Sequence, residues 1–193
     1  TNMSLLFKDK TTFNGDISTW DTSNVVNMQK MFQSATSFIG TSTLSSDVLS
    51  YWDTSSVNDM SYMFSYAASF TGQLSSWDTS NDSDTKEMFR SAHSFNGNIT
   101  NWNTSKVTTM YYMFQDARKF KGHLIPWDVS SVTNMEGMFY GATLYNDSMN
   151  GWNVSSVTNM KDMFRNATSF NFGLFGTPNV TASVTNMANM FRG

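Results

Sequence analysis

The sequence contains no cysteine, only two prolines and few charged residues, and these shortages exclude several classes of protein. Without cysteine the chain has no disulfide framework and no thiolate metal site. Charged residues make up 14% of the chain and the formal net charge is -3, so we predict no nucleic acid partner and no anionic membrane partner. No apolar run reaches the roughly 18 residues of a membrane span. The opening residues TNMSLLFKDK lack the basic, apolar and small-residue regions that follow one another in a signal peptide.

What the chain does contain is one motif repeated along its length. Tryptophan recurs every 25 residues from Trp52 to Trp152, while the interval from Trp20 to Trp52 is 32 because that repeat carries an insertion. The chain starts and stops in the same phase of the repeat, so we expect a segment of a longer chain or assembly. We predict one repeat domain over residues 1-193, with units near 1-19, 20-51, 52-76, 77-101, 102-126, 127-151 and 152-193.

Apolar residues recur at fixed positions and predict the secondary structure of each unit. After Val25 they follow at offsets of 3, 6, 7 and 10, which places them on one stripe of an α-helix. The Asp-Thr-Ser before this stripe supplies oxygen atoms that cap the first turn of a helix. The stretch from Ile17 to Thr22 has room for one brief strand, and the glycine after each unit's phenylalanine predicts a turn with positive φ.

A unit of one short strand and one short helix cannot bury its own apolar stripe, so the units are expected to stack. The predicted fold class is therefore an α/β solenoid of about seven such units. Stacking would place equivalent Trp, Phe and Met side chains on top of one another. Methionine suits this core because its flexible thioether fills gaps beside aromatic rings.

The repeat breaks in WDTSNDSDTKEMF, where Asp82 replaces the valine and Thr85 replaces the first methionine. Burying an unpaired carboxylate is costly, so we predict that this turn is remodelled or open to water. Asp78, Asp82 and Asp84 alternate as calcium ligands do, but the loop lacks the glycine at its sixth position and the glutamate at its twelfth. Calcium is the one cofactor we consider here, and acidic residues at a helix N-terminus are the alternative.

The unit W-[DN]-[TV]-S-x-V-x-x-M-x-x-M-F-x-x-A-x-x-F-N-G resembles the BspA-type leucine-rich-repeat surface proteins, a group with mycoplasma lipoprotein-like repeats of unknown function. The six tryptophans and the pairs from Met31–Phe32 to Met163–Phe164 carry this resemblance. It implies a leucine-rich-repeat-like solenoid, a location outside the cell or on its surface, and a role in adhesion. It brings no catalytic residues.

The remaining residues favour a protein without enzyme activity. The two histidines, His93 and His123, lie in no repeated setting, and no serine sits in a nucleophile elbow. Glycines are spread along the units and form no phosphate-binding loop. We therefore predict no catalysis and no cofactor besides the calcium considered above.

We predict an extracellular or cell-surface scaffold, adhesin or filament subunit whose partner is a protein or a glycan at a cell surface. Uncovered repeat ends would favour head-to-tail self-association into filaments. Tyrosines beside the Met-Phe pairs are expected to face outward as an interaction surface: Tyr62, Tyr66, Tyr111, Tyr112 and Tyr140.

Two further expectations concern the polar residues. In a eukaryotic secretory host, the preferred glycosylation sites are Asn98, Asn146, Asn166 and Asn179. The alternative function is a ligand-binding or ice-binding solenoid with a flat Thr/Asn-rich face. Its threonine row would be Thr22, Thr54, Thr79 and Thr104.

Overall fold

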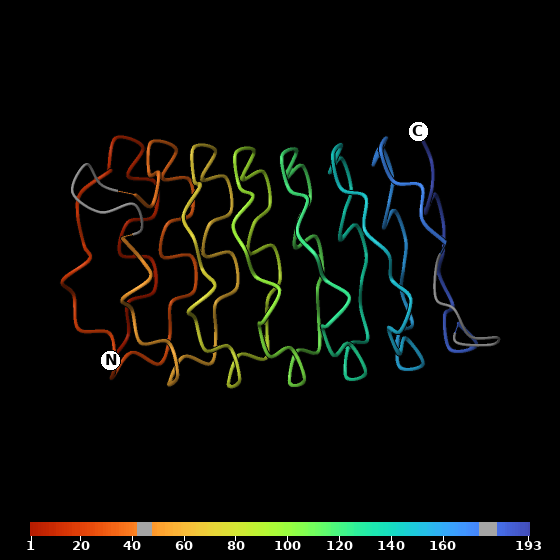
Figure 1. Ribbon diagram of the computed structural model, residues 1–193, viewed down its shortest axis with the longest axis horizontal. Helices are drawn as coiled ribbons and strands as arrows, with labels where there is room; N and C mark the ends of the chain where they lie inside the picture. The colour runs from red at the N-terminus through yellow and green to blue at the C-terminus, as the bar shows by residue number, and fades with distance from the viewer. Residues whose placement is uncertain (42–47, 174–180) are drawn as a thin grey trace.

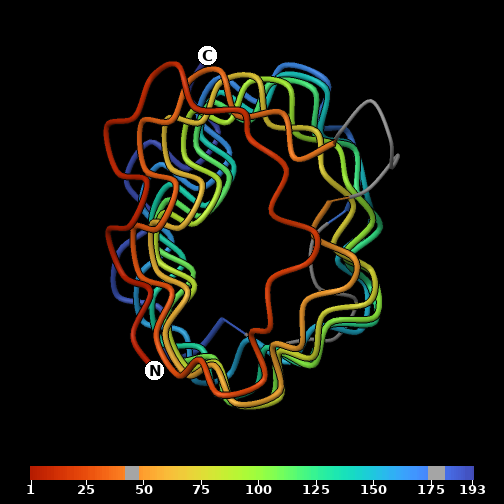
Figure 2. The ribbon, with the colours of Figure 1, turned by 90° about the vertical axis from the view of Figure 1, so that its left-hand side faces the viewer.

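The computed structural model describes residues 1–41, 48–173 and 181–193. Figure 1 shows the described backbone as a row of coils that follow one another in chain order from the N-terminus to the C-terminus. Seen along that row, the coils superpose and share one closed outline (Figure 2). We number the coils by the residue at the position of their parallel bridges: Asn2, Asn27, Asp59, Asp84, Thr109, Asn134, Asn159 and Asn186 begin coils 1 to 8.

The predicted α/β, leucine-rich-repeat-like solenoid of strand-plus-helix units is wrong. The described residues form no helix and no extended strand, and their coils pair through isolated single-residue bridges that lie in the stretches predicted to be helical, such as Asn27. In place of the predicted helix, the segment from Asn27 to Ala35 is dominated by turns. The described part of the chain also contains no helix able to span a membrane.

Two kinds of backbone hydrogen bond alternate along this turn segment. The Met31 N–H donates to the Met28 carbonyl of its own coil at 3.1 Å, whereas the Phe32 N–H donates to the Met63 carbonyl of the next coil at 2.9 Å. Every second donor is thus committed to the neighbouring coil. An α-helix would turn these donors back to the carbonyls four residues earlier and leave the coils unjoined.

In coils 1 to 7, two of the hydrogen bonds within the turn segment close turns whose third residue has a positive φ. Lys30 and Ser34, the third residues of two successive turns in coil 2, have φ angles of 57° and 60°. In coil 6 the same two positions are Gly137 and Gly141, but most coils carry other residues there. Inward side chains spaced three and four residues apart therefore fit this run of turns as well as they fit a helix.

Asparagine or aspartate at the bridge position starts the turn segment. The Asn27 side-chain oxygen accepts the Gln29 N–H at 2.9 Å, and Asn134 does the same for the Glu136 N–H. This local side-chain bond competes with helix formation, because it satisfies the donor in a turn. The polar bridge column is therefore part of the reason that the segment is not helical.

The glycine after each coil's phenylalanine has a steric role, and the predicted positive φ is wrong for most of them. Gly40 has a φ of 79°, but Gly72 and Gly122 at the equivalent positions have no positive φ. A Cβ atom on Gly122 would lie 2.5 Å from the Phe120 ring, well inside the normal distance between carbon atoms. Glycine is needed there to leave room for the ring.

The interior consists of parallel columns of aromatic rings. Successive indoles stack with centroids 6.3 to 6.5 Å apart along Trp20, Trp52, Trp77, Trp102 and Trp127. Beside them the rings of Phe32 and Phe64 lie 5.6 Å apart, and those of Phe38 and Phe70 lie 5.9 Å apart. The predicted stacking of equivalent aromatic groups is confirmed, and Met28 and Met31 fill the space beside the rings.

The tryptophans also link the coils by hydrogen bonds. Nε1 of Trp102 donates to the Leu74 carbonyl of the preceding coil at 2.9 Å, and the equivalent bond occurs at every tryptophan from Trp52 to Trp152. Because these indoles are buried, an unpaired N–H would be costly. One side chain thus serves both the packing and the alignment of successive coils.

Tyr145 takes the place of phenylalanine in one aromatic column and carries an unsatisfied hydroxyl. It is fully buried, and its hydroxyl has no hydrogen-bond partner among the described residues. Burial first, and then the Asp147 carboxylate, raise the pKa of the phenol. The hydroxyl therefore destabilises the fold without a compensating contact.

We expect Tyr145→Phe to raise the free energy of unfolding by about 1 to 2 kcal/mol, because it keeps the ring and removes the unsatisfied group. Urea denaturation followed by tryptophan fluorescence measures this change. Tyr51→Phe is the matched control, since Tyr51 is 72% exposed, and it should leave stability unchanged. Equal stability of the two variants would contradict the assignment of an unsatisfied hydroxyl.

Candidate functional site

Side chains that change from coil to coil distinguish a candidate site from the repeated framework. In a repeat protein the residues that the fold requires recur in each unit, so variable outward positions are free for another role. Such positions occur on the turn segments of coils 2 to 7, and we call them the tyrosine–charge face. Its residues are Lys30, Tyr62, Tyr66, Lys86, Glu87, Arg90, Tyr111, Tyr112, Glu136, Tyr140, Lys161, Asp162 and Arg165.

The turn geometry places most of these side chains on the outside, while Glu87 and Asp162 are covered by their neighbours and are 8% and 4% exposed. Tyr62 and Tyr66 occupy the two positive-φ positions of coil 3, and the residues that follow them, Met63 and Ala67, are buried. Tyr66 is 41% exposed, and the other four predicted tyrosines are half-buried. The structure thus places all five predicted tyrosines on this face, with four of them partly covered by neighbours.

Cations from adjacent coils lie over the tyrosine rings. Lys30 and Lys86 place their Nζ atoms 4.9 and 5.2 Å from the centre of the Tyr62 ring. The Arg90 guanidinium lies 5.4 Å from the Tyr66 ring and 5.7 Å from the Tyr112 ring. Each such contact contributes about 0.5 to 1 kcal/mol at an exposed site. Together they hold the rings in fixed orientations.

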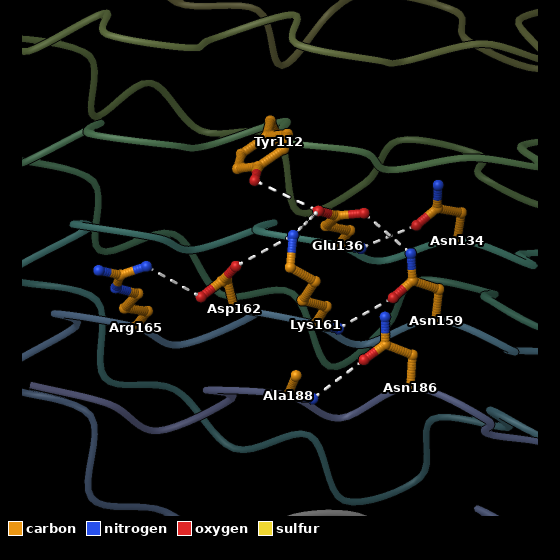
Figure 3. A network of polar contacts seen from close by, with 9 residues as sticks. All are labelled: Tyr112, Asn134, Glu136, Asn159, Lys161, Asp162, Arg165, Asn186 and Ala188. Carbon is orange, nitrogen blue, oxygen red and sulfur yellow. Dashed lines mark hydrogen bonds and ion pairs between the residues drawn. The ribbon is translucent and has the colours of Figure 1, made fainter.

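An ionic network continues the face through coils 5 to 7 (Figure 3). Glu136 accepts hydrogen bonds from Lys161 Nζ at 2.9 Å and from Asn159 Nδ2 at 2.9 Å, and the Tyr112 hydroxyl reaches it at 3.4 Å. Asp162 pairs with Arg165 at 3.3 Å. The carboxylates of this network are therefore already paired inside the protein.

The network also shifts proton affinities. The hydrogen bond to Glu136 and its negative charge raise the pKa of the Lys161 ammonium. Burial, with the Glu136 charge as the next cause, raises the pKa of both Tyr111 and Tyr112. These phenols stay neutral at physiological pH, so they serve as hydrogen-bonding groups.

Sequence reasoning identified the tyrosines and missed the charged residues around them. Glu136 pairs with Lys161 of the next coil, and Arg90 lies over Tyr112 of the next coil. Because these contacts join residues about one repeat apart, no local motif marks them. The available signal was the change of residue type in one outward column. The position two residues after the bridge residue is an example: it holds Gln29, Lys86, Tyr111 and Lys161 in coils 2, 4, 5 and 7, so it has no consensus.

Gly137 makes room for the Tyr112 ring. Its φ is 59°, and a Cβ atom there would overlap the ring. Glu87 and Asp162 occupy the equivalent position with similar φ angles, so the backbone alone does not require glycine. The glycine is needed because the neighbouring coil carries Tyr112, whose ring also contacts Arg90.

We expect Gly137→Ala to lower the free energy of unfolding by about 2 to 3 kcal/mol, because the methyl group displaces the Tyr112 ring and strains the turn. In a Tyr112→Ala background the same change should cost only about 1 kcal/mol. Urea denaturation of the four proteins of this double-mutant cycle measures the coupling. An equal cost in both backgrounds would show that backbone strain alone explains the glycine.

Asp82 occupies the inward column that holds valine in the neighbouring coils. It is 1% exposed, and its Oδ1 accepts the Asp84 N–H at 3.3 Å while Oδ2 has no partner among the described residues. No bridge joins Asp59 to Asp84 in the described chain, although equivalent residues pair at the other junctions. The Asp82 N–H still closes the turn on the Thr79 carbonyl at 3.0 Å, so the pairing of the two coils changes and the turn does not. The expectation that this place opens to water is wrong, because Asp82 is buried.

Burial is the main cause that raises the pKa of Asp82 to about 7. The hydrogen bond from the Asp84 N–H lowers it in part, and the Asp59 and Asp84 charges raise it further. Because the ordinary value is 3.8, the unfolded chain loses this proton at a lower pH than the folded chain. Stability is thus lost as the pH rises from about 4 to 7, and the loss persists above pH 7.

We expect Asp82→Val to raise the free energy of unfolding by about 3 to 4 kcal/mol more at about pH 8 than at about pH 4. Denaturation of both proteins across this pH range measures the difference. Asp53→Asn is the control with the opposite sign, since hydrogen bonds from Ser55 lower the pKa of Asp53. If Asp82→Val stabilised the protein equally at every pH, the raised pKa assigned to the buried Asp82 would be wrong.

The calcium prediction gains no support from the arrangement of its residues. Asp78 caps the Ser80 N–H at 2.8 Å, Asp84 caps the Lys86 N–H at 2.9 Å, and Asp82 is buried. No three acidic or histidine side chains converge as a metal site requires within residues 1–41, 48–173 and 181–193. These aspartates act on the backbone of their own coils.

The threonine row of the alternative function lies inside the coils. Thr22, Thr54, Thr79 and Thr104 are at most 3% exposed. The Thr22 hydroxyl donates to the Asp53 carbonyl of the next coil at 3.0 Å, and the other three make the equivalent bond. The row therefore joins coils and cannot form the flat outer face that the alternative needs.

Three of the predicted glycosylation sites, Asn98, Asn146 and Asn166, are exposed. Asn179 lies outside the described residues. The Asn146 side chain accepts the Asn171 N–H at 2.9 Å, and the Asn98 side chain accepts the Thr100 N–H at 3.0 Å. Their glycosylation stays a prediction, as does head-to-tail self-association.

Comparison with protein families gives one match, and it covers the whole chain. The family described as "Mycoplasma protein of unknown function, DUF285" matches residues 1–96, 38–125 and 97–193. The match supports the mycoplasma repeat part of the resemblance, whereas the BspA-type leucine-rich-repeat part is not confirmed. The comparison with curated proteins found no match.

Proposed function

The chain belongs to the Mycoplasma protein family of unknown function DUF285, and from this premise we propose that it is a non-enzymatic cell-surface or extracellular scaffold. It contacts a partner protein through the tyrosine–charge face. The observation that carries this proposal is the set of tyrosines and arginines fixed in place on variable outward positions.

The composition of the face suits protein recognition. Tyrosine and arginine are enriched in the parts of interfaces that contribute most to affinity. Arg90 already holds Tyr66 and Tyr112, and Arg165 lies 5.3 Å from the Tyr140 ring. A partner that binds these rings therefore has little side-chain entropy left to overcome.

The same contacts make catalysis on this face unfavourable. Glu87 pairs with Arg90 at 2.8 Å, Glu136 with Lys161 at 2.9 Å, and Asp162 with Arg165. A general base needs a carboxylate within reach of a substrate proton, and these carboxylates are occupied by cations. The proposal is accordingly one of binding without turnover.

Adhesion of protein-coated beads to cultured epithelial cells tests the proposal. We expect Tyr66→Ala combined with Tyr111→Ala to reduce the number of bound beads by about tenfold, because the pair removes two ring contacts of an interface core. Tyr51→Ala is the matched control, since it deletes a more exposed tyrosine outside the face.

Circular dichroism of the variants establishes that they are folded before they are compared. Beads that carry the wild-type chain and bind no better than uncoated beads would contradict the adhesive role. Equal loss in the Tyr51→Ala control would contradict the assignment to this face.

A further inference from the structure

A second group of variable residues lies on coil 5, away from the tyrosine–charge face. Arg118, Lys119, Lys121 and His123 are all exposed and fall within six residues of sequence. We call them the basic corner. Although the formal net charge of the chain is -3, this corner is locally positive.

The arginine and the two lysines of the basic corner have no side-chain partner among the described residues. No ion pair, side-chain hydrogen bond or ring contact of Arg118, Lys119 or Lys121 occurs in the described part of the chain. By contrast, Arg90 and Lys161 are tied into ion pairs on the tyrosine–charge face. The corner therefore presents hydrated cations whose charge is not neutralised locally.

The fold does not require these cations. In coil 5 the Phe120 N–H closes a turn on the Ala117 carbonyl at 3.1 Å, with Arg118 and Lys119 between them. The same turn forms at 3.0 Å in coils 4 and 6 with neutral or histidine residues in the middle: His93 and Ser94, and Thr143 and Leu144. Because the turn is unchanged, the charges serve another purpose.

The residues after this turn alternate between buried or half-buried and exposed. Phe120 and Leu124 are buried, and Lys121 and His123 between them are exposed. The Asp147 carboxylate lies 3.2 Å from His123 Nδ1 and accepts the Leu124 N–H at 2.9 Å. Asp147 thus orients the imidazole and does not pair with the lysines.

We propose that the basic corner binds an anionic polysaccharide that carries sulfate or carboxylate groups. Arginine and lysine donate charge-assisted hydrogen bonds to both anions, and several exposed cations within six residues of sequence can contact successive charges of a polymer. The proposal rests on the proposed cell-surface role and names a ligand class for a face that the tyrosines do not occupy.

The chemistry of the corner favours a glycan over a nucleic acid. Single strands are held by several exposed aromatic rings on which successive bases stack. Phe120 is 0% exposed, and the exposed imidazole of His123 is a single ring that already contacts Asp147. Duplex binding draws on roughly 6 to 10 phosphate contacts, more than three or four cations supply. Nucleic acid binding is therefore an outcome to be tested against the proposal.

Binding of the purified chain to heparin and to hyaluronan, measured by surface plasmon resonance at about 100 mM salt, tests the proposal. We expect Lys119→Glu combined with Lys121→Glu to weaken binding by about tenfold or more, since it replaces two attractions with two repulsions. Wild-type affinity should fall roughly sixfold when the salt concentration doubles, as three released counterions require.

The matched control is Lys10→Glu combined with Lys106→Glu, which changes the net charge equally at exposed lysines outside the corner. It should bind the polysaccharides within about threefold of wild type. Heparin binding alone would identify sulfate as the recognised anion, and binding of both polymers would show that carboxylate suffices. Either result supports the proposal.

Three results would overturn it. They are the absence of wild-type binding to both polysaccharides, equal weakening in the control pair, and equally tight binding of a DNA duplex with the same dependence on Lys119 and Lys121. The test is separate from that of the tyrosine–charge face. Tyr66→Ala with Tyr111→Ala should keep heparin binding, and Lys119→Glu with Lys121→Glu should keep bead adhesion.

Discussion

Every second backbone N–H group in the turn segments donates a hydrogen bond to the next coil, and the rest of the structure depends on these bonds between coils. It fixes the separation of successive coils near the spacing of paired strands, about 4.8 Å, without any extended strand. Equivalent side chains are then near neighbours by construction. Indoles stack at 6.3 to 6.5 Å for this reason, and a methionine column fits between rings without a change of backbone.

The same spacing sets the rules for the outer columns. Outward side chains of one coil lie beside those of the coils before and after it, so like charges would repel, whereas a cation beside a ring is favourable. Lys30, Tyr62 and Lys86 follow this rule, and so do Tyr66, Arg90 and Tyr112. A residue on this face is therefore understood from its neighbours in adjacent coils more than from its neighbours in sequence.

That dependence explains which features the sequence predicted. The repeat, the stacked aromatic groups and the outward tyrosines followed from periodicity, because equivalent positions of stacked units must meet. The helix prediction failed because offsets of three and four residues also describe successive turns. The positive φ angles of those turns fall on residues such as Lys30 and Tyr62, which carry no such signature. Gly137 and Gly141 were the visible hint, while the conspicuous glycines such as Gly122 only make space for a ring.

Departures from the repeat therefore have different meanings on the two sides of the backbone. An outward departure, as at Arg118 or Lys119, changes the surface and leaves the turn beneath it intact. An inward departure, as at Asp82, interrupts the pairing of two coils and leaves a carboxylate oxygen unsatisfied. Because inward and outward columns are separate, a coil stack of this kind can acquire distinct contact faces without loss of stability. Asp82 is the exception, because its carboxyl group occupies an inward position in the core and no described side chain forms a hydrogen bond or ion pair with it.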